Sequence, residues 1–125
     1  MLTILQDMQT RLNATPHLLR LGRLFSETVQ LRVDDAEYYL HFKDGHLVDI
    51  AEGPSRKTPY RFALITDADA LQRLWTPRPA PGFHDIFGLV KIGRGRIEGD
   101  ILALVKNLRF FKEFMALARK PEVAT

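Results

Sequence analysis

Alternating apolar and polar residues predict strands in the first half of the chain. Over residues 28–33 the apolar side chains fall at every second position, so that they share one face of an extended strand. The same alternation recurs over residues 37–42, and residues 47–51 form the return strand. Asp44-Gly45 joins these two segments and favours a two-residue hairpin, because type I′ turns need positive φ at both central positions. The result is a three-stranded meander, which residues 60–66 follow as a fourth strand.

Helical spacing of apolar residues predicts two helices before the meander. Residues 2–13 place Leu5, Met8 and Leu12 on one stripe. Thr15-Pro16 then favours a helix start over residues 16–25, because proline is well tolerated at the first helical position. These two helices could pack on the sheet of their own chain or swap onto a partner chain, and the pattern leaves both arrangements open.

Two more helices are expected after the fourth strand. Asp67 is a favourable N-cap for a helix over residues 68–75, because its carboxylate accepts from free backbone N–H groups. Three prolines over residues 77–81 end that helix and stiffen the following loop. A further helix is expected over residues 82–92, where Gly88 lowers the helix propensity.

The last part of the chain combines a short strand with a broadly apolar helix. Residues 93–98 are expected to be extended, and Gly99-Asp100 then breaks the strand and caps a helix. The apolar positions of that helix are Ile101, Leu102, Leu104, Val105, Leu108, Phe110, Phe111, Phe114, Met115 and Leu117. A helix this apolar either packs deep in a domain or covers a cavity. The complete pattern predicts an α+β protein with a five-stranded mixed sheet and helices covering one face.

Length and composition favour one cytoplasmic domain. The chain has 125 residues, contains no cysteine, and shows neither a secretory signal nor a segment long enough to span a membrane. Disulfides, thiolate chemistry and cysteine-based metal sites are therefore excluded. We expect a single domain over residues 1–125, with residues 1–25 as an N-terminal helical segment and residues 120–125 as a disordered tail.

The histidines do not form a recognisable catalytic or metal-binding pattern. In a two-residue hairpin, His41 faces Val48. His46 faces Lys43, so the two histidines beside the turn are not cross-strand partners. A metal site would need a third convergent ligand, and all four histidines of the chain are interpreted as titrating surface groups.

Other forms of catalysis have little support in the sequence. Ser26 and Ser55 are not in a nucleophile-elbow motif, and the glycines over residues 93–99 lack the spacing of a dinucleotide or phosphate loop. Basic and aromatic residues are not interleaved as nucleic-acid binding requires. We expect no catalytic residue, no metal, no cofactor and no nucleic-acid partner.

Positive charge is concentrated near the C-terminal end of the chain. The formal net charge is +3, and five of the basic residues are Arg94, Arg96, Lys106, Arg109 and Lys112. This region could meet an anionic membrane surface, an acidic partner or nucleic acid, but a solvated helix face is the simpler interpretation. Large apolar residues recur in the same half of the chain, and they fit either an ordinary core or an apolar tunnel.

Three segments resemble the sterol carrier protein 2 (SCP2) domain family. The C-terminal signature matches at Gly93, Arg94, Arg96, Ile97, Gly99, Asp100, Leu102, Ala103, Lys106 and Leu108. Residues 38–40 with Asp44-Gly45 are similar to the second strand and hairpin of the family, and residues 64–71 are similar to the strand and capped helix that follow.

The resemblance implies a tunnel between sheet and helices that holds a lipid-like ligand, without catalytic residues. Such a ligand would be a fatty acid, an acyl-CoA, a phospholipid, a sterol or a prenylquinone, held for sequestration or transfer. The ligand-binding residues that the resemblance implies are Phe83, Phe87, Val90, Leu104, Leu108, Phe111 and Met115. We add Trp75, because it is a large apolar residue of an amphipathic helix. One alternative is a non-catalytic accessory protein of lipid or ubiquinone biosynthesis that acts with partner enzymes. Another is an enzyme that uses His41, His46 or His84.

Overall fold

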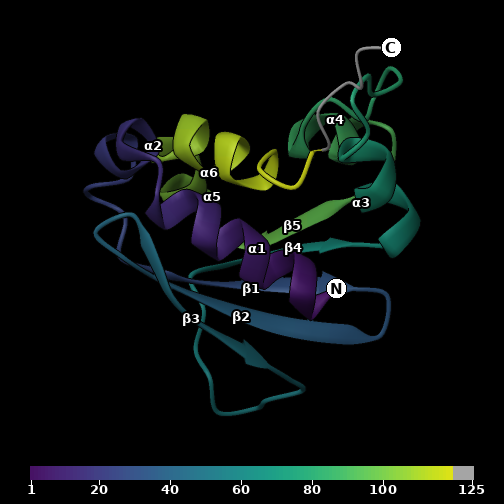
Figure 1. The fold of residues 1–125 in the computed structure, drawn as a ribbon. Helices are drawn as coiled ribbons and strands as arrows, with labels where there is room; N and C mark the ends of the chain where they lie inside the picture. Colours follow the sequence, from purple (N-terminus) through teal and green to yellow (C-terminus); the bar gives the residue numbers. More distant parts are fainter. Residues whose placement is uncertain (120–125) are drawn as a thin grey trace.

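Five strands form one mixed sheet, which confirms the architecture predicted from the alternation (Figure 1). The computed structural model describes residues 1–119. The strands are β1 (Thr28–Val33), β2 (Ala36–Lys43), β3 (His46–Glu52), β4 (Phe62–Thr66) and β5 (Arg96–Gly99). Their order is β3-β2-β1-β4-β5, with β1 and β4 parallel and the other neighbours antiparallel. The tail expected over residues 120–125 lies outside the described part of the chain.

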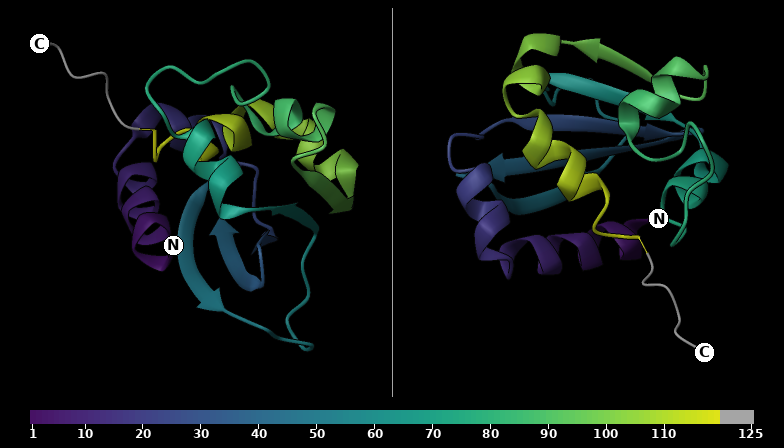
Figure 2. Two further views of the ribbon diagram at one scale, coloured as in Figure 1. Left: turned by 90° about the vertical axis from the view of Figure 1, so that its right-hand side faces the viewer. Right: turned by 90° about the horizontal axis from the view of Figure 1, so that it is seen from above.

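The helices lie on the same side of the sheet (Figures 1 and 2). They are α1 (Leu2–Asn13), α2 (Pro16–Leu21), α3 (Ala68–Leu74), α4 (Ile86–Lys91), α5 (Ile101–Lys106) and α6 (Leu108–Met115). Asp67 and Asp100 cap α3 and α5 as expected, by accepting from the N–H groups of Ala70 and Ala103. The polypeptide therefore forms two layers, with the core between the sheet and the helices.

A cluster of phenylalanine rings fills the centre of this core. Its members are Phe25, Phe42, Phe62, Phe110, Phe111 and Phe114, all of them buried. Phe42 of the sheet contacts Phe114 of α6 with ring centroids 5.1 Å apart, and Phe62 contacts Phe111 at 5.3 Å. Because burying one such side chain contributes about 1.5–3 kcal/mol, this cluster is a principal source of stability.

Two of the expected helices are shorter than predicted. The helix expected over residues 16–25 ends at Leu21, where Gly22 packs directly against the ring of Phe110. The helix expected over residues 82–92 begins only at Ile86, because Gly82 has a φ of +92° and the side chain of Asp85 supplies the N-cap.

The long final helix predicted from residue 101 onward is two helices that meet at Asn107. Asn107 leaves helical geometry with φ −121° and ψ 25°, and its side chain donates to the carbonyl of Ala103. The break changes which apolar residues face the core. Phe110 and Phe111 are buried, whereas the apolar side chains at the start of α5 face outward.

The β2–β3 hairpin also differs from the prediction in one detail. Asp44 and Gly45 have φ values of 50° and 82°, as the expected type of turn requires. A bulge beside His41 shifts the register, so that His41 pairs with Asp49 and not with Val48. Next to the turn, Lys43 pairs with His46, as predicted.

The N-terminal helix packs on its own chain. The stripe of Leu5, Met8 and Leu12 is completely buried, and α1 lies along β3 at the edge of the sheet (Figure 2). On the face of the sheet opposite to the helices, the hydroxyl of Tyr39 donates a hydrogen bond of 2.9 Å to the carbonyl of Ser55. This bond ties the connection between β3 and β4 to the sheet. Both features are tertiary contacts that periodicity alone does not predict.

Candidate ligand-binding site

A cleft of about 660 Å³ lies between α1, the end of α3 and the segment that follows α6. Its lining residues are Thr3, Ile4, Asp7, Arg11, Gln72, Trp75, Thr76, Pro77 and Ala118. Ile4 remains 38% exposed here, because it lies beside the buried stripe of α1 and not on it. Five of the nine lining residues are polar and four are apolar, but apolar groups contribute the larger part of the cleft surface, which is compatible with a small-molecule site.

Trp75 forms the inner part of this cleft and is firmly held. The residue is the C-cap of α3, and only 5% of its surface is exposed. Its indole Nε1 donates a hydrogen bond of 2.7 Å to the carbonyl of Met115. A buried indole with its N–H satisfied is fixed in one orientation, and only a small part of its surface faces the cleft.

Two arginines fasten the segment after α6 across the cleft. Arg11 Nη1 donates to the carbonyl of Leu117 at 3.0 Å, which ties this segment to α1. Arg119 donates from Nε to the carbonyl of Leu74 and from Nη2 to that of His84, both at 3.0 Å. Because three distant parts of the chain meet here, the cleft exists only in the folded domain.

The mouth of the cleft carries an ion pair. Arg11 Nε lies 2.9 Å from Asp7 Oδ2, one turn earlier on α1, and about half of each side chain is exposed. Exposed pairs of this kind contribute little to stability. The guanidinium can therefore exchange Asp7 for a ligand carboxylate or phosphate at small cost.

The structure places the sequence-predicted binding residues in three environments. Trp75 lines the cleft, and Met115 is joined to it through its carbonyl. Leu104 and Phe111 are buried in the core, whereas Phe83, Phe87 and Leu108 are partly buried and Val90 is 38% exposed. A shared role of these eight residues in lining a tunnel stays a prediction.

Several cleft residues were not singled out from the sequence. Ile4, Arg11, Pro77 and Ala118 come from three separate segments. Ile4 had one available signal, because it is an apolar residue adjacent to the buried stripe of α1. Arg11 had none, since an arginine on the polar face of a helix is ordinary.

Most of the basic residues noted in the sequence are paired in the structure. Arg94 Nη2 lies 3.0 Å from Asp67 and 3.1 Å from Asp69. The hydrogen bonds from Arg94 and from the backbone of Ala70 hold the pKa of Asp67 below its ordinary value. The other ion pairs are Arg96–Glu98, Arg109–Glu113 and Lys112–Asp85. Lys106 has no hydrogen-bond or ion-pair partner within residues 1–119.

The histidines lie apart in the structure. His41 Nδ1 is 2.9 Å from the hydroxyl of Thr28, and His17 Nε2 is 3.2 Å from Glu113. Within residues 1–119, no three histidine or acidic side chains are grouped so that they could hold a metal ion. These contacts are structural hydrogen bonds between neighbouring elements.

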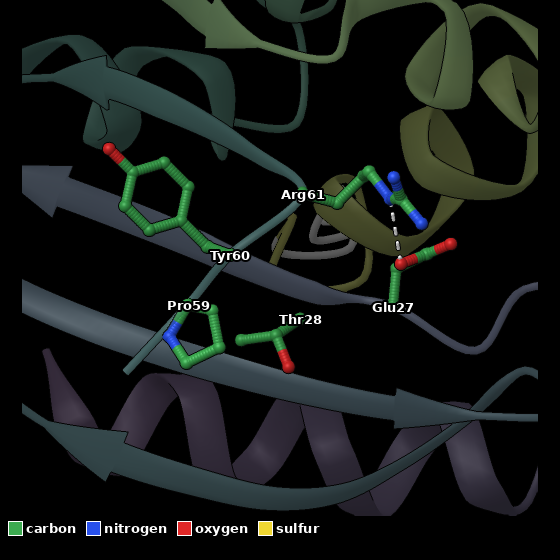
Figure 3. A pocket seen from close by; sticks show the side chains of 5 residues that line it. All are labelled: Glu27, Thr28, Pro59, Tyr60 and Arg61. Carbon is green, nitrogen blue, oxygen red and sulfur yellow. Dashed lines mark hydrogen bonds and ion pairs between the residues drawn. The ribbon is translucent and has the colours of Figure 1, made fainter. Parts of the chain in front are cut away.

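A second, smaller hollow lies beside the start of β4 and is more polar (Figure 3). It is lined by Glu27, Thr28, Pro59, Tyr60 and Arg61, and has a volume of about 310 Å³. Arg61 Nε donates to Glu27 Oε2 at 3.0 Å, and Arg61 Nη1 lies 3.6 Å from Asp100 (Figure 3 shows the first pair). The surface of this hollow is more polar than that of the cleft, so the hollow is less suited to an apolar ligand.

Comparison with solved structures identifies the fold. No family model matches the sequence, and no curated protein matches it. A crystal structure of sterol carrier protein 2 superposes with a TM-score of 0.74 at 15% identity, covering 96% of each chain. A conserved hypothetical protein from Thermus thermophilus gives 0.70 at 14% identity, covering 98% of this chain and 90% of the other.

A third match is to the UbiJ-SCP2 ubiquinone synthesis protein. It has a TM-score of 0.60 at 20% identity, with 89% of this chain and 88% of the other covered. The chain therefore has the SCP2 fold, as its sequence resemblance implied. Across residues 1–119, every helix falls short of the length and apolar character needed to cross a membrane.

Proposed function

We propose that this protein binds a lipid-like ligand and sequesters or transfers it. The observation that carries the proposal is the cleft beside Trp75, which opens between helices of an SCP2 fold. An apolar chain that enters it gains about 25 cal/mol for each Å² of apolar surface removed from water. Fatty acids, acyl-CoA, phospholipids, sterols and prenylquinones all supply such a chain.

The core behind the cleft supports this proposal. Met115 accepts the Trp75 indole N–H through its backbone carbonyl, and its buried side chain belongs to the apolar core behind the cleft. Phe83, Phe87 and Leu108 are partly buried and pack against the same core. In this proposal no side chain acts as a catalyst, and the protein works in the cytoplasm.

A test is native mass spectrometry of the purified protein, followed by organic extraction of what it carries. The proposal predicts substoichiometric lipids whose chemistry names the ligand class. A ligand-free mass that does not change on addition of fatty acids or quinones would contradict it.

The second candidate function is an accessory role beside partner enzymes of lipid or ubiquinone biosynthesis. The specific observation in its favour is that the UbiJ-SCP2 ubiquinone synthesis protein has the same fold. In this role the domain would hold a prenylated intermediate and present it to an enzyme. Affinity purification from cells under mild conditions would then recover stoichiometric enzymes, and an isolated monomer would argue against the role.

The enzymatic alternative makes a separate prediction. If His41, His46 or His84 were catalytic, one histidine-to-alanine change would abolish turnover of a lipid substrate without unfolding the domain. We propose instead that all three variants bind lipid as the wild type does, since none of these histidines lines the cleft.

A further inference from the structure

Three aliphatic side chains stand exposed together on α5. Ile101, Leu102 and Val105 are 52%, 58% and 51% exposed. Val105 lies four residues after Ile101 and three after Leu102, so its side chain neighbours both of them on the helix surface. We call these three residues the α5 apolar face. Single exposed aliphatics are common in proteins, but a cluster on one helix face indicates an interaction site.

The break at Asn107 is the reason for this exposure. A continuous helix would carry one apolar stripe against the core from α5 into α6. Asn107 ends α5, and the next four buried side chains belong to α6 alone. On α5, only Leu104 is fully buried. The apolar side chains of α6 therefore pack in the core, whereas three apolar side chains of α5 face outward.

Positive charge adjoins the α5 apolar face. Lys106 follows Val105 directly, is exposed, and lacks an ion-pair partner in residues 1–119. The Arg109 side chain is 79% exposed, and its pair with Glu113 is long, at 3.3 Å. Leu108, Arg109, Lys112 and Glu113 border a surface hollow of about 480 Å³. An apolar patch with basic neighbours matches the chemistry of an anionic phospholipid surface.

The acidic groups of the flanking segments are engaged within the protein. Glu113 lies 3.3 Å from Arg109 and 3.2 Å from His17. Asp100 accepts from the N–H of Ala103 and lies 3.6 Å from Arg61 Nη1. Glu98 pairs with Arg32 and Arg96. These carboxylates are partly neutralised, so they oppose the approach of anionic headgroups less than free carboxylates would.

We propose that the α5 apolar face, with Lys106 and Arg109, docks the domain on an anionic phospholipid membrane. The three side chains insert at the boundary of headgroups and acyl chains, and the two cations face the lipid phosphates. A second copy of the chain fits less well, since three half-exposed side chains supply only a fraction of the roughly 800 Å² per partner that a stable interface buries. The inference does not require the cleft to hold a ligand.

Sedimentation with phospholipid vesicles tests this proposal. The vesicles contain phosphatidylcholine alone or phosphatidylcholine mixed with phosphatidylglycerol. We expect the wild type to bind the mixed vesicles, less so at high salt, because salt screens the attraction between charges. Val105→Asp should weaken binding by about tenfold or more, and Lys106→Glu should weaken binding to the mixed vesicles alone.

Two matched variants control for the changes in charge. Val48→Asp alters a valine of similar exposure, 56%, on β3 at the opposite edge of the sheet. Lys57→Glu alters an exposed lysine of the β3–β4 connection. Both should bind vesicles as the wild type does, and thermal unfolding checks that all four variants are folded.

Three results would overturn the inference. The wild type could fail to bind either vesicle, or Val105→Asp could bind as tightly as Val48→Asp. Alternatively, sedimentation equilibrium could show a dimer that Val105→Asp dissociates, which would make the α5 apolar face a contact between copies. None of these results depends on the content of the cleft, which native mass spectrometry reports separately.

Discussion

Asn13 and Leu47 exchange two hydrogen bonds across the edge of the sheet. Asn13 Nδ2 donates to the Leu47 carbonyl at 3.1 Å, and Asn13 Oδ1 accepts from the Leu47 N–H at 3.1 Å. Gln9 Nε2 also donates to that carbonyl, at 2.8 Å. The last turns of α1 therefore act as a short substitute for a further strand beside β3. Free strand edges promote aggregation, and this arrangement occupies part of one.

Replacement of Asn13 by alanine should destabilise the protein. The variant leaves the Leu47 N–H without its partner, and a lost hydrogen bond of this kind costs about 1 kcal/mol. The measurement is the free energy of unfolding in urea. Gln6→Ala is a matched control, because Gln6 is an exposed amide on the same helix. Equal stability of the two variants would show that the contact with Leu47 is not structural.

Gly22→Ala should also destabilise the protein, for a steric reason. A Cβ at this position would overlap Cε1 of Phe110, so the ring or the end of α2 must move. Overpacking of this kind costs about 1–3 kcal/mol. The quantity to measure is again the free energy of unfolding in urea.

A double variant separates this clash from backbone effects. Phe110→Leu removes the ring atoms that the new methyl group would meet. Because the two sites are in contact, the combined loss should be smaller than the sum of the single losses. Additive losses would mean that Gly22 is needed for its backbone conformation and not for space.

Asp67 should make stability depend on pH in the acidic range. Its pKa is lowered from the ordinary value of 3.8 by hydrogen bonds from the Arg94 side chain and the Ala70 backbone. A group with a lowered pKa in the folded state stabilises the protein above its ordinary pKa. That contribution is lost as the pH falls through the folded-state value.

Asp67→Asn is the variant that tests this dependence, because asparagine is an equally good N-cap without a charge. At pH 7 the variant should be less stable than the wild type. The difference between their unfolding free energies should shrink as the pH falls below about 4. A difference that stays constant from pH 7 to pH 2 would exclude the Arg94 contact as its source.

Ile4→Asp should weaken ligand binding in the cleft. Ile4 lines the cleft and is 38% exposed, so the variant should fold but place a carboxylate against an apolar chain. We expect the variant to bind a fatty acid at least about tenfold more weakly than the wild type, as measured by calorimetric titration. Leu24→Asp is the control, since Leu24 is 82% exposed and is not a cleft residue. Equal losses in both variants would argue against the cleft as the site.

The strands were predictable because their pattern is local. The alternation in residues 28–33, the turn at Asp44-Gly45 and the caps at Asp67 and Asp100 need only neighbouring residues, and the structure confirms them. The helix break at Asn107 and the bulge beside His41 depend on contacts formed in the folded chain. The apolar stripe of residues 101–117 therefore predicts one helix where the structure has two.

The candidate site was less predictable than the fold. Trp75 is singled out in the sequence as a large apolar residue, and the structure places it in the cleft. Ile4, Arg11 and Ala118 join it from parts of the chain that are far away in the sequence. Periodicity predicts which side chains of one helix or strand face the core. It does not predict which distant segments the tertiary fold brings together.

Fluorescence of Trp75 tests the central claim most directly, because it is the only tryptophan in the sequence and it lines the cleft. The titrant is a fatty acid brominated along its chain, since bromine quenches an indole at short range, and the unbrominated fatty acid is the reference. The account predicts saturable quenching at one ligand per chain, shifted to higher concentration in Ile4→Asp. Quenching no greater than with the unbrominated fatty acid would contradict ligand binding beside Trp75.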